Sequence, residues 1–169
     1  MSCVVIFAKT SKALARLNKQ IHDKEIKKVY WAITKNNPPK DEDTLVNFLK
    51  KNEAKNKSFV VSRGEGGLES ILHYTLIAKS DHYHLLEIHL ETGRHHQIRV
   101  QLANMGCPIR GDLKYGFGIS NKVSSISLHA RSVEFMHPIK KEKIKITAPV
   151  PDEPLWNYFV SFTEKSLEL

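Results

Sequence analysis

Short runs of β-branched, aromatic and aliphatic residues alternate with polar turns along most of this chain, and that pattern predicts a structure built mainly of strands. The segments that fit are residues 4–7, 27–34, 59–62, 72–78, 82–91, 125–135 and 143–147. The segments 72–78 and 82–91 are close enough in sequence to form a hairpin. In the second arm of that hairpin Leu86, Ile88 and Leu90 fall on one face, which is typical of a half-buried antiparallel strand.

One helix is predicted near the start of the chain. Residues 12–22 have a helical spacing of apolar positions, and Thr10 or Ser11 before them can cap the free N–H groups of the first turn. The apolar face of this helix is expected to comprise Ala13 or Leu14, Leu17 and Ile21. The lysine-rich segment 41–57 fits either a strand or a helical turn, and the sequence leaves both open.

Together these elements predict an α+β fold with a mixed, mainly antiparallel sheet and a few helices. The chain has 169 residues, which is enough for one domain with a sizeable core. No repeat and no convincing linker divides it, so a single domain over residues 1–169 is predicted.

The net charge is +8, from 26 lysines and arginines against 18 aspartates and glutamates. A basic balance of this size favours a polyanionic partner such as a nucleic acid or an acidic membrane surface. An inert basic surface is the alternative, and charge alone does not decide between them.

The two cysteines, Cys3 and Cys107, form neither a CxxC pair nor a disulfide framework, which favours a reducing cytoplasm. The apolar opening over residues 1–8 is too short to span a bilayer and lacks the features of a signal peptide. No later run is long enough for a span, so no membrane partner is expected.

Many polar donors gather where a predicted strand meets a second predicted helix, in the stretch ETGRHHQIRVQLANMG at residues 91–106. Gly93 allows a sharp turn before the helix, and Gly106 is a suitable stop. The helix is expected to bury Ile98, Leu102 and Met105 and to carry Arg94, His95, His96 and Gln97 at its start, with Arg99 beside the two histidines.

Free N–H groups at a helix start attract anions, whereas an arginine there is unfavourable to the helix dipole unless an anion is near. A site for phosphate or carboxylate is therefore favoured over the ordinary alternative, a solvated helix face with surface ion pairs. No metal site is expected, because adjacent histidines on a helix point roughly 100° apart and no HExxH spacing or cysteine cluster is present.

The same stretch, continued to residue 116, closely resembles the motif ETGR-x-HQIR-x-QL…G-x-P-I-x-GD-x-x-YG of the RluA-type RNA pseudouridine synthases. Other parts of the chain agree, in the order of that family. VVIFAKTSKALARLN resembles the segment after the family's catalytic loop, KKVYWA is similar to its K-x-Y-x-A tyrosine motif, and LHA with EFMHPIKKEKIKITAPVP resembles its closing segment. The resemblance covers nearly the whole chain.

The resemblance implies the catalytic-domain fold of that family and the isomerisation of uridine to pseudouridine within RNA, with neither cofactor nor metal. The target base is flipped out of its stack into a pocket, where an aspartate nucleophile attacks the nucleotide. By motif, Tyr30 matches the active-site tyrosine that stacks on the base, and Arg99 matches the arginine that pairs with the catalytic carboxylate. The matching substrate or RNA-binding positions are Arg94, His96, Gln97, Ile98 and Leu128.

The family's nucleophile lies in an HRLD-x-x-x-SG loop, of which this chain contains only the end. Ser2 matches the serine of the loop, Cys3 replaces its glycine, and the aspartate would lie three residues before Met1. Asp112 belongs to the separate GD motif, and no other aspartate matches a catalytic position. The expectation is an N-terminally truncated catalytic domain that is inactive as written, with an exposed sheet edge or apolar face through which it could self-associate.

Two functions remain open at this point. The first is an RNA pseudouridine synthase whose chain is shortened here, and the second is a non-catalytic RNA-binding remnant of such an enzyme. Both predict salt-sensitive binding to RNA, with ribosomal and transfer RNA equally open as the partner. A metal-dependent nuclease is set aside, because the sequence has no acidic ligand cluster.

Overall fold

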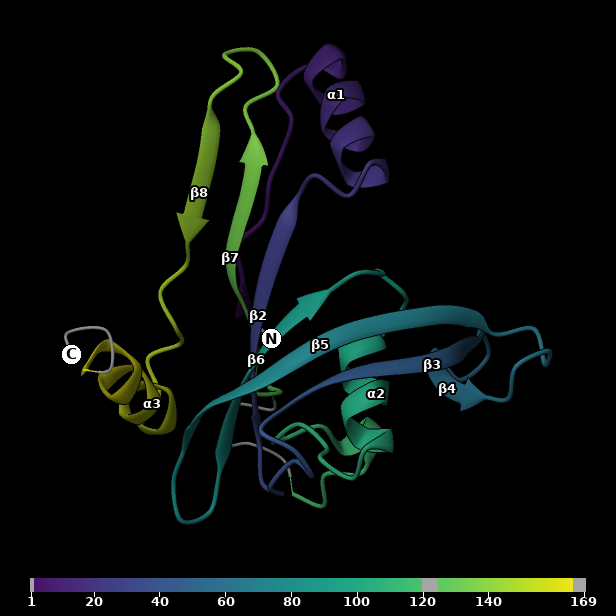
Figure 1. Ribbon diagram of the computed structural model, residues 1–169, viewed down its shortest axis with the longest axis vertical. Coiled ribbons are helices and arrows are strands. Elements are labelled where there is room, and N and C mark those ends of the chain that lie inside the picture. The colour runs from purple at the N-terminus through teal and green to yellow at the C-terminus, as the bar shows by residue number, and fades with distance from the viewer. Residues whose placement is uncertain (1, 120–124, 166–169) are drawn as a thin grey trace.

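Within the described residues eight strands form one sheet, and an interior strand, Lys27–Thr34, carries the tyrosine motif (Figure 1). The computed structural model describes residues 2–119 and 125–165. Its strands are β1 (Ser2–Cys3), β2 (Lys27–Thr34), β3 (Glu42–Asn52), β4 (Lys57–Val61), β5 (Leu68–Lys79), β6 (His84–Leu90), β7 (Leu128–Met136) and β8 (Lys143–Thr147).

The strand order is β1-β7-β2-β6-β5-β3-β4, and β8 pairs with the later part of β7. Every pairing between these strands is antiparallel except that of β1 with β7. This confirms the predicted α+β fold with a mainly antiparallel sheet, and it resolves the open segment 41–57 as strand β3 and the start of β4.

The helices are α1 (Ser11–His22), α2 (Gln97–Asn104) and α3 (Pro154–Lys165), with a short 3-10 helix η1 (Leu113–Tyr115) after α2. Thr10 caps α1 as predicted, because its hydroxyl accepts a hydrogen bond from the Ala13 N–H at 3.2 Å. Helix α3 was not predicted, although Pro154 at its first position and the spacing of Trp156 and Phe159 are helical signals. Both aromatic side chains are buried.

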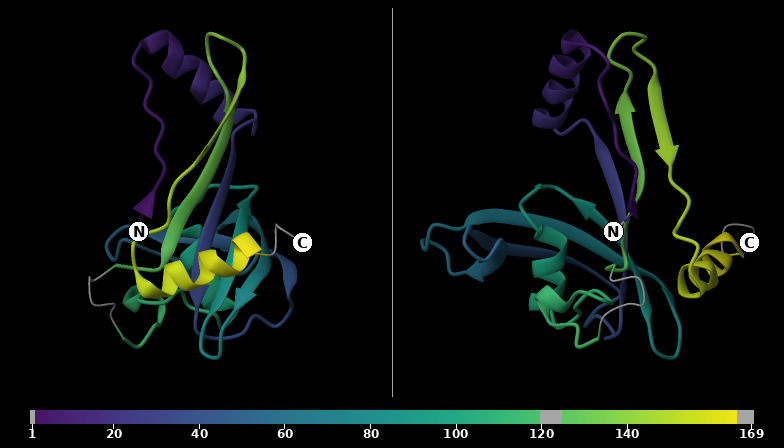
Figure 2. Two further views of the ribbon diagram at one scale, coloured as in Figure 1. Left: turned by 90° about the vertical axis from the view of Figure 1, so that its left-hand side faces the viewer. Right: turned by 180° about the vertical axis from the view of Figure 1, so that it is seen from behind.

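Alternate residues of β2 face the two sides of the sheet, and a helix covers each side (Figure 2). Ala32, with Tyr30 packed at the margin, belongs to the core cluster beneath α2. Trp31 and Ile33 point the other way and pack with Trp156 of α3. Tyr30 therefore lies on the α2 face of the sheet, where the period-2 alternation of a strand places it.

The segment from Val4 to Phe7 is not a strand, so this prediction was wrong. Strand β1 ends at Cys3, and beyond it only the Val4 N–H is bonded to β7, at 3.4 Å from the Ala130 oxygen. Burial still alternates along this segment, with Val5 and Phe7 exposed. A single hydrogen bond to β7 is too little pairing to make this segment a strand, although its β-branched composition favours a strand.

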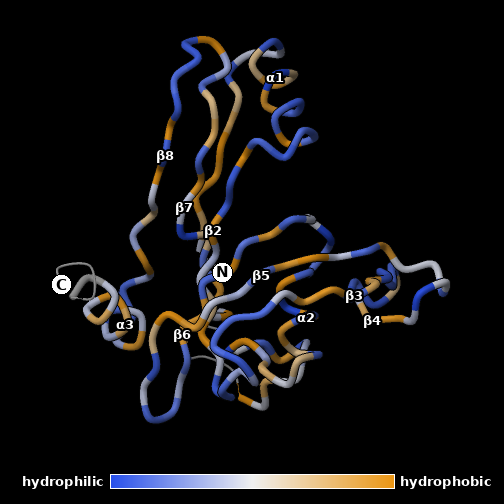
Figure 3. Tube along the Cα trace, viewed as in Figure 1, coloured by the Kyte–Doolittle hydropathy of each residue, from blue (hydrophilic) through white to orange (hydrophobic). Residues whose placement is uncertain are grey.

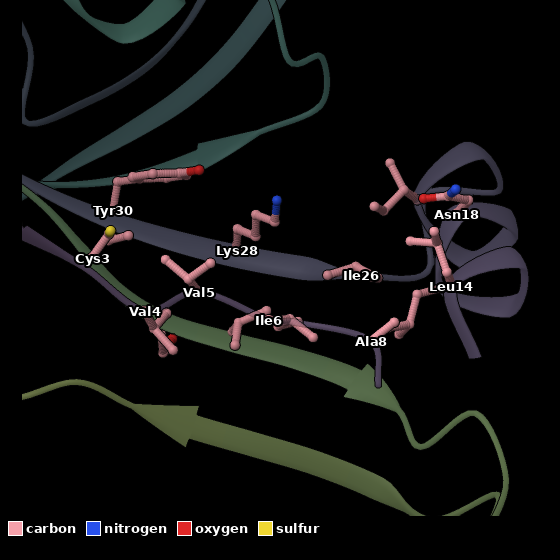
Figure 4. Close-up of a pocket in the computed structure, with 15 residues that line it drawn as sticks. Cys3, Val4, Val5, Ile6, Ala8, Leu14, Asn18, Ile26, Lys28 and Tyr30 are labelled. Carbon is pink, nitrogen blue, oxygen red and sulfur yellow. The ribbon is translucent and has the colours of Figure 1, made fainter. Parts of the chain in front are cut away.

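The predicted apolar face of α1 is only partly covered. Leu17 is buried against β7, whereas Leu14 and Ile21 are more than half exposed. They border an apolar groove of about 350 Å³ between α1, the segment after β1, and strands β2 and β7 (Figure 4). Figure 3 shows apolar positions interspersed with polar ones along α1. Within the described residues, no helix has both the length and the apolar character needed to cross a bilayer.

Candidate functional site

A pocket of about 310 Å³ opens on the α2 face of the sheet, beside Tyr30. The residues that line it are Tyr30, Leu90, Arg94, His96, Gln97, Ile98, Arg99, Ile126 and Leu128. All seven site residues expected from the sequence are among them, although they come from β2, the turn after β6, α2 and β7. Leu90 and Ile126 were not predicted as site residues, because apolar side chains at strand ends are usually part of the core.

The turn before α2 is held by one buried side chain, Gln97, which is 2% exposed. Its Oε1 accepts hydrogen bonds from the Arg94 N–H and the Thr92 hydroxyl, both at 2.9 Å, and its Nε2 donates to the Ile71 carbonyl at 3.1 Å. Gln97 therefore fixes the turn to the neighbouring strand β5, and Arg94 stays exposed at the pocket rim.

Helix α2 begins at Gln97, later than the position after Gly93 that was predicted. Its N-cap is His96, in the left-handed conformation with φ of 55°, and no side chain caps the helix start. The prediction that the two histidines diverge by roughly 100° was therefore wrong, because both precede the helix. Their rings are stacked instead, with centroids 3.8 Å apart.

Arg99 lies at the centre of a polar network behind the pocket. Its Nε and Nη2 donate to the two carboxylate oxygens of Asp112, each at 2.7 Å, and Asp112 is 1% exposed. Its Nη1 lies 3.0 Å from Nε2 of His96. Arginine has no acceptor, so Nε2 of His96 accepts this bond and the ring proton is assigned to Nδ1, which donates to the Tyr115 hydroxyl at 3.0 Å.

His96 is held in the neutral form by its surroundings. Burial, followed by the neighbouring positive charge of Arg99, lowers the pKa of His96 to about 4. A protonated His96 would carry hydrogens on both ring nitrogens and could not accept from Arg99. The network therefore depends on a neutral imidazole.

Tyr30 is half-buried, and its ring forms one wall of the pocket. Burial raises the pKa of the Tyr30 hydroxyl, with a smaller contribution from the nearby Cys3 thiol. The phenol is therefore protonated at neutral pH. Figure 4 shows the ring lying above Cys3 on the same face of β2 as Lys28.

None of the described residues that line this pocket carries a carboxylate, whereas Arg94 and Arg99 both line it. Flat apolar contacts from Tyr30, Ile98 and Leu128 suit a planar ring, and the two arginines suit an attached anion. Within residues 2–119 and 125–165, no group of three or more histidine, cysteine, aspartate or glutamate side chains is placed to hold a metal ion.

Comparison with known proteins gives consistent matches. The family model described as RNA pseudouridylate synthase matches residues 2–104. The chain is 36% identical over 156 residues to a ribosomal large subunit pseudouridine synthase C of Buchnera aphidicola, covering 88% of this chain and 50% of that protein. It is also 36% identical over 152 residues to an uncharacterized RNA pseudouridine synthase, YhcT, of Bacillus subtilis, covering 89% of this chain and 49% of that protein.

Among solved structures, human RNA pseudouridylate synthase domain containing 1 superposes with a TM-score of 0.72 at 19% sequence identity. The match covers 90% of this chain and 66% of that one, and it supports the fold. The chain spans about half the length of the curated relatives it matches.

Proposed function

Because the chain belongs to the RNA pseudouridylate synthase family, we propose that it forms the uridine-binding part of an RNA pseudouridine synthase active site. The observation that carries this proposal is the convergence of seven separately predicted residues on one pocket. The proposed substrate is a uridine within structured RNA. A base inside a helix is out of reach of such a pocket, so the nucleotide has to leave its stack to enter.

In this proposal each side chain acts through its position in the pocket. Tyr30 stacks on the uracil ring, and Ile98 and Leu128 hold the ring in place by apolar contact. Arg99, already oriented by Asp112, directs its remaining N–H groups toward the carboxylate of the nucleophile. Arg94 at the rim contacts the RNA backbone.

We infer from the motif match that the nucleophile has no counterpart in these 169 residues. In the family's reaction an aspartate attacks the nucleotide, the uracil is freed from its sugar, and the base is rejoined through carbon. None of the described residues that line the pocket is an aspartate, and both carboxylate oxygens of Asp112 are bonded to Arg99. We therefore propose that the chain as written binds uridine-containing RNA without isomerising it.

The test combines binding with a release assay. Isomerisation frees the hydrogen at C5 of uracil, so RNA containing 5-tritiated uridine releases tritium into water only when the reaction proceeds. The unmodified chain is expected to bind this RNA and to release no tritium. The Tyr30→Ala variant is expected to bind the RNA more weakly. Release of tritium would overturn the proposed inactivity, and binding that is indifferent to Tyr30→Ala would overturn the proposed site.

A non-catalytic RNA-binding protein is the second candidate, because Arg94, Arg99 and the apolar walls of the pocket serve RNA binding with or without a nucleophile. The two candidates predict different natural proteins. The mass of the intact natural protein distinguishes them: a longer protein with an HRLD-like loop before Ser2 supports the enzyme, and a protein that starts at Met1 supports the remnant.

Ribosomal RNA is the first RNA class to test. The Buchnera aphidicola relative is, by its name, an enzyme of the large ribosomal subunit, and it aligns with 88% of this chain. Transfer RNA is the alternative. Competition between large-subunit ribosomal RNA and bulk transfer RNA for the purified chain, at one salt concentration, decides between them.

A further inference from the structure

A second cavity continues from the candidate site toward the end of α1. It also measures about 310 Å³, and it shares Tyr30 and Leu90 with the first pocket. Its remaining lining comes from three places: Ile21 and Lys24 at the end of α1, Ile26 and Lys28 leading into β2, and the turn from Glu91 to Gly93. The two cavities therefore adjoin at Tyr30 and Leu90, and together they are called the trough.

Lys28 is placed where its amine can contact a ligand that enters the first pocket. It lies two residues before Tyr30 on the same strand, so both side chains rise from the same face, about 7 Å apart along β2. Figure 4 shows the Lys28 amine extending into the space between Tyr30 and α1. The side chain is exposed, and no carboxylate of the described residues lies within ion-pair distance of its amine.

Lys24 adds a second positive charge at the other side of the cavity. It follows α1 in the left-handed conformation, with φ of 57°, and its N–H donates to the Ile21 carbonyl at 3.2 Å. This conformation ends the helix and brings Lys24 to the cavity that Lys28 also lines. No described carboxylate forms an ion pair with its amine either.

One negative group, Glu91, also lines this cavity. Its Oε1 is bonded to Nε2 of His73 at 2.6 Å, on the neighbouring strand β5, so the carboxylate has a partner of its own. The charged residues at the cavity are therefore two lysines and one glutamate that is already bonded to His73. The walls between them are apolar, from Ile21, Ile26 and Leu90, and a low-polarity wall strengthens the attraction of a cation for an anion.

We propose that Lys24 and Lys28 bind phosphate groups of the RNA strand next to the nucleotide whose base occupies the Tyr30 pocket. This inference rests on the proposed function and extends it by assigning a path to the RNA backbone. The base lies over Tyr30, and the adjoining phosphodiester runs along the trough toward the end of α1. The competing account is that the two lysines only cover the apolar wall with their stems while their amines are solvated.

The experiment measures binding of a fluorescein-labelled 12-nucleotide oligouridylate by anisotropy, between about 50 and 200 mM salt, where counterion release makes phosphate contacts visible. The variants are Lys24→Gln, Lys28→Gln and the double variant. Lys145→Gln on the edge strand β8 is the matched control, because it removes one exposed charge from the face of the sheet opposite to that of Lys28. Lys28→Arg tests whether charge alone is sufficient.

If the proposal holds, each glutamine variant weakens binding several-fold at low salt. Each also lowers the slope of log affinity against log salt by about 0.7, the value expected for one phosphate contact on a single strand. The double variant lowers the slope by about twice as much, Lys28→Arg keeps it, and Lys145→Gln leaves it unchanged.

Tyr30→Ala in the same assay separates the two proposals. If Tyr30→Ala weakens binding while both lysine variants behave like Lys145→Gln, the phosphate path is overturned and the proposed function stands. If the unmodified chain shows no salt-dependent binding, or if Tyr30→Ala has no effect, the proposed function fails and the phosphate path fails with it.

Discussion

Arg99 and Asp112 form a two-pronged ion pair in which Nε and Nη2 each lie 2.7 Å from a different carboxylate oxygen. The carboxylate is almost fully buried and the guanidinium is 18% exposed. The pair joins α2 to the segment just before η1, so the guanidinium is oriented before any ligand arrives. A side chain fixed in this way loses little freedom when it meets an incoming anion.

Asp112→Asn is expected to lower the free energy of unfolding by about 3 kcal/mol, because removing one partner leaves the buried charge of Arg99 uncompensated. Urea denaturation followed by circular dichroism measures the loss. Glu53→Gln is the control, because Glu53 pairs with Lys51 on the surface and its side chain is 78% exposed. Equal, small effects of the two substitutions would contradict the assigned role of the pair.

Tyr30→Ala is expected to weaken binding of oligouridylate about tenfold or more, since base stacking on an aromatic ring contributes about 1–3 kcal/mol. Tyr30→Phe keeps the ring and should bind within about twofold of the unmodified chain. Tyr158→Ala, on the exposed side of α3, removes a tyrosine from elsewhere and serves as control. Equal losses for Tyr30→Phe and Tyr30→Ala would assign the effect to the hydroxyl and rule out stacking.

Strand β2 was predictable to the residue because its signal is local. The β-branched and aromatic run KKVYWAIT ends at a proline-containing turn, and both faces of its second half, from Trp31 to Thr34, are covered in the folded chain. The segment from Val4 to Phe7 has a similar composition and still is not a strand. What it lacks is a continuous partner ladder, and composition carries no information about partners.

The motifs predicted residues that line one pocket, but they did not predict the contacts between these residues. Sequence spacing placed His95 and His96 on a helix, whereas the left-handed φ of His96 delays the helix and stacks the two rings. The pairing of Arg99 with Asp112 joins residues 13 positions apart through a turn of irregular backbone. Only the folded geometry reveals that pairing.

Acidification is expected to loosen the network around His96. Its pKa in the folded chain, about 4, is below the ordinary value, so the unfolded chain binds the proton first as the pH falls. The stabilisation from neutral His96 is complete above about pH 6.5 and is lost progressively as the pH falls toward about 4. The facing groups are Arg99, His95, Lys114 and Asp112.

The measurement is the unfolding midpoint between about pH 7.5 and 4.5. His96→Asn should flatten this pH dependence, because asparagine tolerates the left-handed backbone and does not titrate. His82→Asn, an exposed histidine in the turn between β5 and β6, should keep the profile of the unmodified chain. A His96→Asn profile as steep as that of the unmodified chain would assign the acid sensitivity to other groups.

Ser2 is expected to hold the start of the chain against β7. Its hydroxyl lies 2.7 Å from Nδ1 of His129, and His129 is 1% exposed. Ser2→Ala leaves that buried nitrogen without its partner, which costs about 1–3 kcal/mol. In Ser2→Ala, hydrogen exchange of the Val4 N–H, which bonds to the Ala130 carbonyl, should be faster than in the unmodified chain. Ser11→Ala is the control and should leave the exchange rate of the Val4 N–H unchanged. Unaltered Val4 exchange in Ser2→Ala would show that β1 is held by its backbone pairing alone.

The apolar groove between α1 and β2 is expected to drive self-association. Val5, Leu14 and Ile21 are each more than half exposed and border about 350 Å³ of mainly apolar space. In sedimentation velocity the unmodified chain should show a weight-average mass that rises with concentration. The double variant Leu14→Gln with Ile21→Gln should stay monomeric, because glutamine keeps the helix while removing the apolar surface. Ile139→Gln, in the exposed turn between β7 and β8, is the control and should associate as the unmodified chain does. An unmodified chain that stays monomeric over the whole concentration range would show that the exposed side chains are too few, or too scattered, to bury a stable interface.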